Sequence, residues 1–527
     1  MTAEAPGRRV NFVQAFLSSA LATGLSRVFG VFREAAVTGF LGVGETSDAF
    51  NLAWTIPNVF RRFVADEGLT GAMIPALAKA EADGGVDELR RLGAAAFGAL
   101  LLANVVLVAA GIAGAQWLVL AFAPAWSDEP DRLQLAVGMT RFMFPMVALF
   151  SAVSYFEGLL NYRGHFFVPK FGPALVSIGV IVGAVALGQW FDRPVYALVL
   201  GTIVGGVAEV ALNVPAVWSY WGRLSVSLDF RSPRVRAIAR EMSKVIAIGL
   251  FAQVNLLVLQ QLATSLPAGS LTIYRNSTQL TDLAQGMIAV AIGSALLPNI
   301  SASVSTQSWD QFRVELARAL RLAAFLLVPA AVVLLCYGTP VTAMVFRVGK
   351  YRWEDVQLTA SALKFLSPFV LGVAGINIVK KVYFALEQRG TLLVVGALGV
   401  GLTAALGWTL TPRFGLHGLV GALSLSIGLQ LAAYFALLWW QLREKVGLGG
   451  LVLPLAKTVA ASVPLGAVLL AAVPLGQWQD GPKNPLNWVV FAGGFGAAGG
   501  VYLLAALALR IDEVHAVLEK VRRRVRR

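Results

Sequence analysis

Cysteine, histidine and charge are all scarce in this chain of 527 residues. The single cysteine, Cys336, lies in an apolar run, so the sequence excludes a disulfide framework and a metal site built from thiolates. The three histidines, His165, His417 and His515, lack the spacing of a ligand set. Charged residues make up 14% of the chain and hydrophobic residues 57%. This composition predicts an all-α polytopic membrane protein.

Motifs of nucleotide and metal enzymes are also missing. The chain has no Walker A sequence, no glycine-rich dinucleotide turn and no HExxH pair, and the segment 42–47, GVGETS, lacks the lysine of a phosphate loop. We therefore expect no cofactor and no ATPase. Transport by such a chain would be driven by Na⁺ or H⁺, by the membrane potential or by the substrate gradient. Asn255 and Glu387 are candidate contacts for a coupling cation.

Charges do occur within one apolar stretch, residues 26–82, which predicts two membrane-length helices joined by a turn at residues 42–45. The charges considered are Arg27, Arg33, Asp48, Arg61 and Arg62. A charge at the bilayer centre costs roughly 2.5–3.5 kcal/mol on insertion scales, so such residues usually face a bundle interior or a wet cavity. The sequence therefore predicts a cationic, water-accessible cavity suited to a phosphate-bearing ligand.

The spacing of these charges supports the cavity for one pair and leaves alternatives for the others. Asp48 and Arg62 share a helix face within about 40° at 100° per residue. Arg27 and Arg33 do not share a face unless the helix bends between them. Arg61 and Arg62 could instead snorkel to a membrane interface, and Arg27 could mark the cytoplasmic end of a short helix.

Hydropathy and proline or glycine breaks predict fourteen transmembrane helices. They fall near residues 11–40, 46–77, 92–122, 135–160, 171–190, 195–220, 240–265, 272–302, 316–338, 358–387, 391–411, 416–441, 453–474 and 487–509. Lys and Arg gather in alternate connections, above all in 220–245, and this positive-inside pattern predicts that both termini are cytoplasmic. The basic tail then meets anionic membrane lipid, and we expect no nucleic-acid partner.

Two halves of the chain resemble each other at a nearly constant offset. Pro75 matches Pro298, and residues 141–145 match residues 364–368, each pair 223 positions apart; Arg163-Gly164 matches Arg389-Gly390 at 226. A duplicated unit of six helices gives two lobes with the same orientation and a central cavity that opens to either side alternately. The predicted domains are 1–223 (N-lobe, helices 1–6), 224–445 (C-lobe, helices 7–12), 446–511 (helices 13–14) and 512–527 (basic cytoplasmic tail).

Several motifs together resemble the MurJ/MviN family of lipid II flippases, within the multidrug/oligosaccharidyl-lipid/polysaccharide exporter superfamily. They are Ser26-Arg27, Gly30, Arg33-Glu34, Thr46 to Phe50, Ile56-Pro57-Asn58, Arg61-Arg62, Glu67-Gly68, Leu296-Leu297-Pro298, Gly415-Leu416, Gly421 to Ser426 and Trp440 to Arg443. The resemblance covers nearly the whole chain, and the first group is specific.

The resemblance implies transport of lipid II, an undecaprenyl-diphosphate-linked peptidoglycan precursor, from the inner to the outer leaflet of the bacterial cytoplasmic membrane, by a monomer that is not an enzyme. It implies a cavity whose arginines are Arg27, Arg33 and Arg62, with Asp48 as acidic partner. Arg61 and Glu67 would support or gate this site. The last two helices would form an apolar groove for the lipid tail.

The chain departs from the family pattern in two places. The family pattern Arg-Arg-x-x-Ala-Glu-Gly is one residue longer here, so either Asp66 or Glu67 takes the place of its glutamate. The family's cavity arginine on the eighth helix falls on Gln279, with Asp282 at the position of a nearby acid. Arg275, one turn before Gln279, is the candidate that supplies the missing cation.

Three other functions remain open on the residues alone. One is a flippase for another polyprenyl-diphosphate-linked oligosaccharide, and a second is a cation-coupled drug antiporter of the same superfamily, against which the excess of cavity arginines argues. The third, a membrane enzyme acting on polyprenyl phosphates, needs acidic metal-binding pairs. The cluster Asp128, Glu129 and Asp131 is better explained as a solvated loop.

Overall fold

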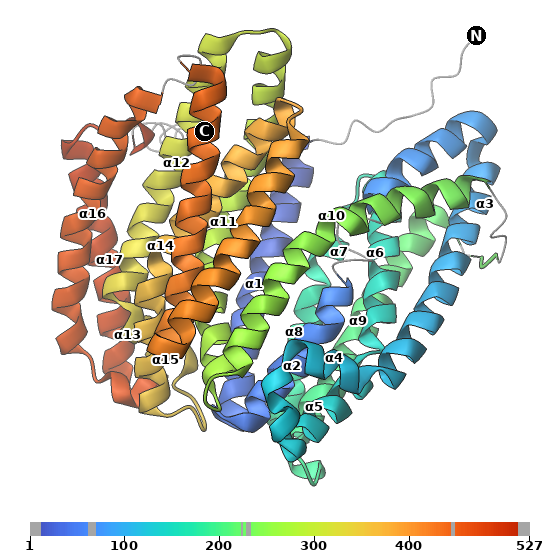
Figure 1. The fold of residues 1–527 in the computed structure, drawn as a ribbon, viewed down its shortest axis with the longest axis horizontal. Coiled ribbons are helices and arrows are strands. Elements are labelled where there is room, and N and C mark those ends of the chain that lie inside the picture. Colours follow the sequence, from blue (N-terminus) through green and yellow to red (C-terminus); the bar gives the residue numbers. More distant parts are fainter. Residues whose placement is uncertain (1–11, 62–69, 223–224, 228–232, 444–447, 515–527) are drawn as a thin grey trace. The chain divides into compact units, whose positions relative to one another are not determined.

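The computed structural model describes residues 12–61, 70–222, 225–227, 233–443 and 448–514, and its long elements are α-helices (Figure 1). The chain divides into two compact units, Met1–Val37 with Ala49–Val254 and Thr38–Asp48 with Asn255–Arg527. The division falls within helices α1 (Phe12–Leu41), α2 (Glu45–Arg61) and α10 (Pro233–Thr264). The tip of the α1–α2 hairpin, residues 38–48, thus belongs to the second unit.

Helices of very different lengths build the two units. The first unit holds α3 (Thr70–Ala113), α4 (Ala115–Phe122), α5 (Pro130–Met143), α6 (Met146–Tyr162), α7 (Phe167–Phe171), α8 (Pro173–Val182) and α9 (Val195–Trp221), with η2 (Pro124–Asp128), η3 (Gly183–Leu187) and η4 (Gly188–Trp190). The second unit holds α11 (Ser270–Ser305), α12 (Trp309–Cys336), α13 (Gly338–Phe346), α14 (Trp353–Ala385), α15 (Arg389–Leu442), α16 (Val452–Ala472) and α17 (Pro485–Ala508). Short turns η6 (Leu448–Leu451), η7 (Val473–Leu475) and η8 (Trp478–Lys483) flank its last two helices.

Nine helical segments of the described chain are long and apolar enough to cross a membrane. This confirms the all-α membrane class, since a helix satisfies its own backbone hydrogen bonds in lipid. The segment Gly390–Leu442 is 53 residues long, and Gly415 interrupts it with φ 58° and ψ −135°. Gly85 interrupts α3 in the same manner with φ 67°. Both interruptions lie between stretches that the sequence predicts as separate helices, and glycine adopts these angles without a Cβ clash.

The predicted turn between the first two helices is confirmed. Helix α1 ends at Leu41, Gly42 has φ 81° and donates its N–H to the carbonyl of Thr38 at 2.8 Å, and α2 begins at Glu45. This is the usual way for glycine to end a helix in left-handed backbone. The turn brings the N-terminal end of α2 back beside the end of α1.

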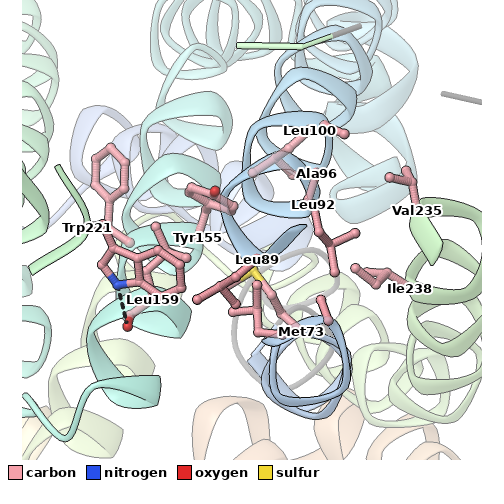
Figure 2. Close-up of a cluster of buried hydrophobic side chains, with 14 of the residues drawn as sticks. Met73, Leu89, Leu92, Ala96, Leu100, Tyr155, Leu159, Trp221, Val235 and Ile238 are labelled. Atoms are coloured by element: carbon pink, nitrogen blue, oxygen red, sulfur yellow. Dashed lines mark hydrogen bonds between the residues drawn. The ribbon is translucent and has the colours of Figure 1, made fainter. Parts of the chain in front are cut away.

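The core of the first unit lies where α3, α6 and α9 meet (Figure 2). Met73, Leu92 and Leu159 are nearly or fully buried there. Two aromatic side chains also satisfy backbone carbonyls: Tyr155 donates to Gly93 at 2.8 Å, and the Trp221 indole donates to Leu159 at 3.0 Å. Because lipid offers no hydrogen bonds, such pairs fix the helices against one another while keeping polar groups satisfied.

A comparable core holds α12, α14 and α15 of the second unit together. Its buried members include Phe312, Val379 and Tyr434, and the Tyr383 hydroxyl donates to the carbonyl of Tyr434 at 3.0 Å. The central helix of each core, α6 or α14, thus anchors one of its neighbours through a tyrosine.

Helices α16 and α17 pack against each other and contact the rest of the second unit mainly through α12. The Tyr502 hydroxyl of α17 donates to the carbonyl of Phe325 at 2.6 Å, and Tyr337 donates to that of Val490 at 3.2 Å. The remaining faces of both helices expose large apolar side chains, among them Val459, Val463, Leu470, Trp488, Val489 and Leu504. These faces suit contact with lipid.

Candidate functional site

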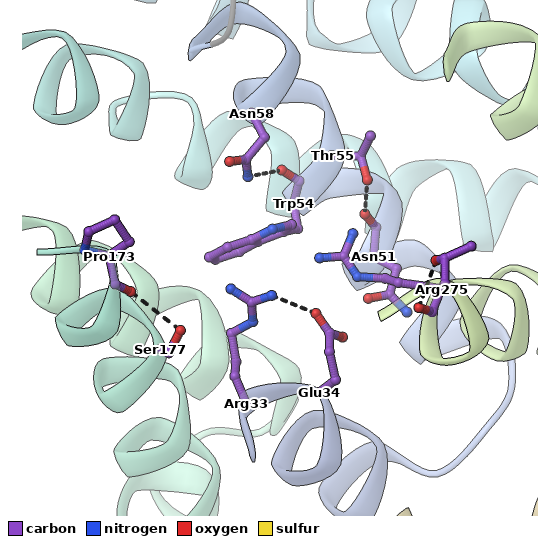
Figure 3. Close-up of polar contacts among 10 residues, drawn as sticks. Arg33, Glu34, Asn51, Trp54, Thr55, Asn58, Pro173, Ser177 and Arg275 are labelled. Carbon is purple, nitrogen blue, oxygen red and sulfur yellow. Dashed lines mark hydrogen bonds and ion pairs between the residues drawn. The ribbon is translucent and has the colours of Figure 1, made fainter. Parts of the chain in front are cut away.

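Arg33 is held within the first unit by two neighbours (Figure 3). Its Nη2 lies 2.7 Å from Oε1 of Glu34, and its guanidinium carbon lies 4.5 Å from the centre of the Trp54 ring. The Arg33 side chain is 13% exposed and that of Glu34 only 2%. The carboxylate offsets the cost of burying the cation, and the ring face adds a cation–π contact. The arrangement orients a partly accessible guanidinium on an apolar helix.

Beyond Trp54, helix α2 carries two further polar side chains, Asn58 and Arg61 (Figure 3 shows Asn58). Asn58 donates its side-chain amide to the carbonyl of Trp54 at 2.8 Å, and a narrow hollow of ≈ 10 Å³ lies beside Trp54, Asn58 and Phe150, enough for about one water. One helical turn further, the Arg61 guanidinium lies 5.2 Å from the Phe150 ring centre. Arg61 is therefore half-buried against α6 in the described structure.

The other predicted residues of this region are placed only in part. Arg27 is half-buried on α1, six positions before Arg33, with helical backbone between them. Arg62 and Glu67 lie outside the described residues. The predicted face shared by Asp48 and Arg62 is therefore untested.

Asp48, almost fully buried, caps the start of helix α11. Its Oδ2 accepts the Gly269 N–H at 2.7 Å, while Oδ1 accepts the Thr272 N–H at 2.8 Å and the Thr272 hydroxyl at 2.6 Å. Residue 269, the N-cap of α11, is a glycine and brings no side chain. A carboxylate from α2 thus supplies the acceptor that a helix start requires and complements its positive end.

Glycine is required at position 269 for two reasons. Its φ is 92°, and a Cβ there would lie 2.6 Å from a methyl carbon of Val43. Next to Asp48, the Ser47 hydroxyl accepts from the Thr272 hydroxyl at 3.0 Å. The start of α11 therefore fits closely against residues 43–48.

A second contact holds the same hairpin tip to the turn between α13 and α14. The Lys350 N–H donates to the carbonyl of Gly39 at 2.7 Å, and the Lys350 ammonium lies 5.9 Å from the Phe40 ring centre. Arg347 steadies this turn by donating to the carbonyl of Tyr351 at 2.7 Å. Burial raises the pKa of the Tyr351 phenol, which stays neutral and hydrogen-bonds the Thr359 hydroxyl at 2.5 Å.

Helix α11 carries the three candidate residues of the eighth predicted helix. Arg275 and Gln279 are half-buried and Asp282 is exposed. The helix is continuous from Ser270 to Ser305, so Arg275 and Gln279 do lie one turn apart on neighbouring parts of one face. Whether Arg275 replaces the family's arginine stays a prediction.

The candidate cation contacts are not brought together by any interaction described. Asn255 is half-buried in α10, with a buried Oδ1 that has no hydrogen-bond partner among the described residues. Glu387 is exposed after α14 with φ 58°. Within the part of the chain described, three or more metal-ligating side chains do not cluster anywhere. Asp128, Glu129 and Asp131 are all exposed, where η2 ends and α5 begins.

Sequence reasoning missed the partners of the site residues. Glu34 was named only as part of a family motif and Trp54 was not named at all. No local pattern links Asp48 to Gly269 and Thr272, which lie more than 200 positions later. Glu209, a buried acid inside the apolar helix α9, was also passed over. The charge rule applied to residues 26–82 would have found it.

These features define a class: a multi-pass helical membrane protein with oriented arginine inside its helices. A solved structure described as "Lipid II flippase MurJ, inward closed conformation" shares the fold, with a TM-score of 0.76 over 94% of this chain and 100% of that chain, at 16% identity.

The sequence comparisons then identify the family. The family model described as "Lipid II flippase MurJ" matches residues 37–481. A Burkholderia cenocepacia protein named lipid II flippase MurJ is 30% identical over 441 residues, 83% of this chain and 84% of that protein. A Rhizobium meliloti protein named probable lipid II flippase MurJ is 26% identical over 536 residues, 98% and 97% of the two chains. The chain belongs to the MurJ family.

Proposed function

We propose that this protein is a transporter that moves lipid II from the inner to the outer leaflet of the bacterial cytoplasmic membrane. The observation that carries the proposal is the match to the family of lipid II flippases over residues 37–481. The oriented Arg33 supports it, because a diphosphate needs cationic donors in a membrane-embedded site. The protein works as a monomer and catalyses no covalent step.

The proposed architecture has fourteen transmembrane helices with both termini in the cytoplasm. Nine segments meet the length and hydropathy criteria, the break at Gly415 divides one of them into two, and α1, α2, α10 and α11 supply the rest. Residues 1–223 and 224–445 form two six-helix lobes around a central cavity. The similar cores around α6 and α14 support this duplication.

The proposed substrate site combines cations from both lobes. Arg27, Arg33 and Arg62 of the N-lobe and Arg275 of the C-lobe neutralise the diphosphate, and Gln279 contacts the polar head. Arg61, Glu67 and Asp282 adjust or gate these groups. Arginine suits this task since its planar fork binds phosphate oxygens in pairs and keeps its charge when buried.

The hairpin tip supports a proposal for alternating access. Residues 38–48 belong to the proposed N-lobe, yet they bond to the start of α11 and to Lys350, both of the proposed C-lobe. The three connections involved all face outward in the predicted topology. We infer that these bonds close the outer side of the cavity and break when it opens outward.

The proposed lipid-tail groove uses α16 and α17. Their exposed apolar faces are wide, and they lie outside the duplicated lobes. Na⁺, H⁺ or the membrane potential supplies the energy for the cycle.

Depletion of the protein in its source cell tests the function. Lipid II should then accumulate in the inner leaflet while total lipid II synthesis continues, as measured by accessibility of the precursor to an externally added, membrane-impermeant probe. Unchanged exposure of lipid II at the outer leaflet would reject the proposal. Accumulation of a different polyprenyl-diphosphate oligosaccharide would favour the alternative flippase.

A further inference from the structure

A buried carboxylate lies near the middle of helix α9, away from the arginines of the proposed substrate site. Glu209 is 2% exposed, and its Oε2 has no hydrogen-bond partner among the described residues. One turn later, Asn213 is fully buried; it donates its amide to the Glu209 backbone carbonyl at 2.9 Å, while its Oδ1 is without a described partner. Two buried acceptor oxygens thus lie one turn apart on α9.

The surroundings of Glu209 are shaped for its carboxyl group. A Cβ at Gly172, the residue before α8, would lie 2.7 Å from Oε1 and 2.8 Å from Cγ of Glu209. A side chain at position 172 would therefore displace the Glu209 carboxyl from its present position.

Two charged groups of the described residues act on Glu209. The Arg61 guanidinium and the Glu157 carboxylate act on it electrostatically, and Glu157 is already paired with the ammonium of Lys170 at 2.5 Å. Among the other elements packed on α9, α8, η3 and η4 carry no ionisable side chain, and α5 carries Asp131, Arg132 and Arg141. Arg132 is itself paired with Glu129 at 2.9 Å and stacked on Trp126.

An ionised carboxylate with an unsatisfied oxygen is costly at this depth. A bound cation removes that cost, and carboxylate and amide oxygens are hard ligands that suit a proton or Na⁺. We propose that Glu209 and Asn213 form a monovalent-cation site inside the first unit, taking H⁺ on the carboxylate or Na⁺ between the two oxygens. This site differs from the candidate contacts Asn255 and Glu387, which belong to the second unit.

The test measures cation binding to the purified full-length protein in detergent, without lipid II. Thermal unfolding is followed at constant ionic strength in NaCl, KCl and choline chloride, and across pH 5 to 9. For a Na⁺ site, Na⁺ raises Tm saturably where K⁺ and choline do not. For a proton site, Tm depends on pH through one titrating group more than in Glu209→Gln, and Na⁺ does not change Tm.

Glu209→Gln should abolish whichever response the wild type shows. Asn213→Ala should weaken the Na⁺ response but leave a proton response. Gly172→Ala keeps every ionisable group and displaces only the carboxyl, so it should shift the midpoint of either response even if Glu209→Gln fails to fold.

Glu315→Gln is the matched control. It removes another carboxylate from an apolar helix, one that lies 3.6 Å from the Arg318 guanidinium, and should leave the response unchanged. The same Na⁺ and pH dependence in wild type, Glu209→Gln and Gly172→Ala would overturn the proposal. Because no substrate is present, that outcome is independent of whether the protein transports lipid II.

Discussion

Arg33 illustrates how a single charge is made useful inside an apolar helix. Glu34 balances its charge and the Trp54 face restricts its rotation, so the guanidinium is oriented before any ligand arrives. Pre-orientation lowers the entropy lost on binding. An isolated arginine on the surface is not oriented in this way, because exposed ion pairs contribute little free energy.

Replacement of Arg33 should therefore separate charge from geometry. We expect Arg33→Ala to abolish support of cell-wall synthesis without loss of protein, and Arg33→Lys to keep part of the activity, because lysine retains the charge and loses the planar fork. Arg62→Ala should match Arg33→Ala. Growth of a depleted strain carrying each variant, with immunoblots for protein level, measures both effects. Normal growth on either alanine variant would reject the cavity assignment.

Arg275 and Gln279 allow a test of compensation along one helix. They lie one turn, about 5.4 Å, apart on α11. If Arg275 supplies the cation missing at 279, Arg275→Ala should be as damaging as Arg33→Ala, and Gln279→Ala should be mild. The double change Arg275→Ala with Gln279→Arg should restore growth. Full growth of Arg275→Ala would show that this protein needs one cavity cation fewer.

At the scale of elements, helix α11 depends on a residue outside itself. Its N-cap is a glycine, and the carboxylate of Asp48 satisfies two of its first N–H groups. The first turn of α11 is thus capped by Asp48 only while the α1–α2 hairpin tip lies against it. A helix end of this kind is suited to a conformational change, since one contact decides whether it is capped.

Loss of the Asp48 carboxylate should loosen the start of α11. Replacing an N-cap acceptor costs about 1–2 kcal/mol, and about 1.4 kcal/mol is a tenfold change in local opening. In Asp48→Ala we expect the amides of Gly269 and Thr272 to exchange hydrogen about tenfold faster. Exposed Glu45, in the first turn of α2, provides the control Glu45→Gln, which should leave these amides unchanged. Unaltered exchange in Asp48→Ala would contradict the capping role.

Removal of helices α16 and α17 should leave the proposed lobes folded. They pack on α12 through contacts such as Tyr502 to Phe325, and a truncation after Arg443 would expose an apolar α12 face to lipid. We expect the truncated protein to fold, as judged by monodisperse purification, and to lose transport. Transport at an unaltered rate would reject the lipid-tail groove.

At the scale of the whole molecule, one cross-link should test alternating access. The Ser47 and Thr272 hydroxyls are 3.0 Å apart, close enough for a disulfide after replacement by cysteine. In a Cys336→Ala background, oxidation of Ser47→Cys/Thr272→Cys should stop transport, and reduction should restore it, because the outer side cannot open. Each single cysteine variant is the control. Transport by fully cross-linked protein, with cross-linking measured by thiol labelling, would reject opening at this point.

The sequence by itself determined the membrane class, the helix turn at Gly42, the connections between predicted helices in which the breaks at Gly85 and Gly415 fall, and the family. These follow from local quantities: apolar length decides what can enter a membrane, and glycine decides where backbone can leave the helical region. The arginines of α1 and α2 were found for the same reason, since a charge in an apolar run is visible without coordinates.

Only the tertiary structure decided what those charges contact. Trp54 reaches Arg33 from the next helix, and Asp48 reaches the start of α11 across more than 200 positions of the chain. Glu209 shows the same limit, because its burial and the space left by Gly172 depend on how α7, α8 and α9 pack. Such contacts have no period along the chain, and they exist only once packing brings distant backbone together.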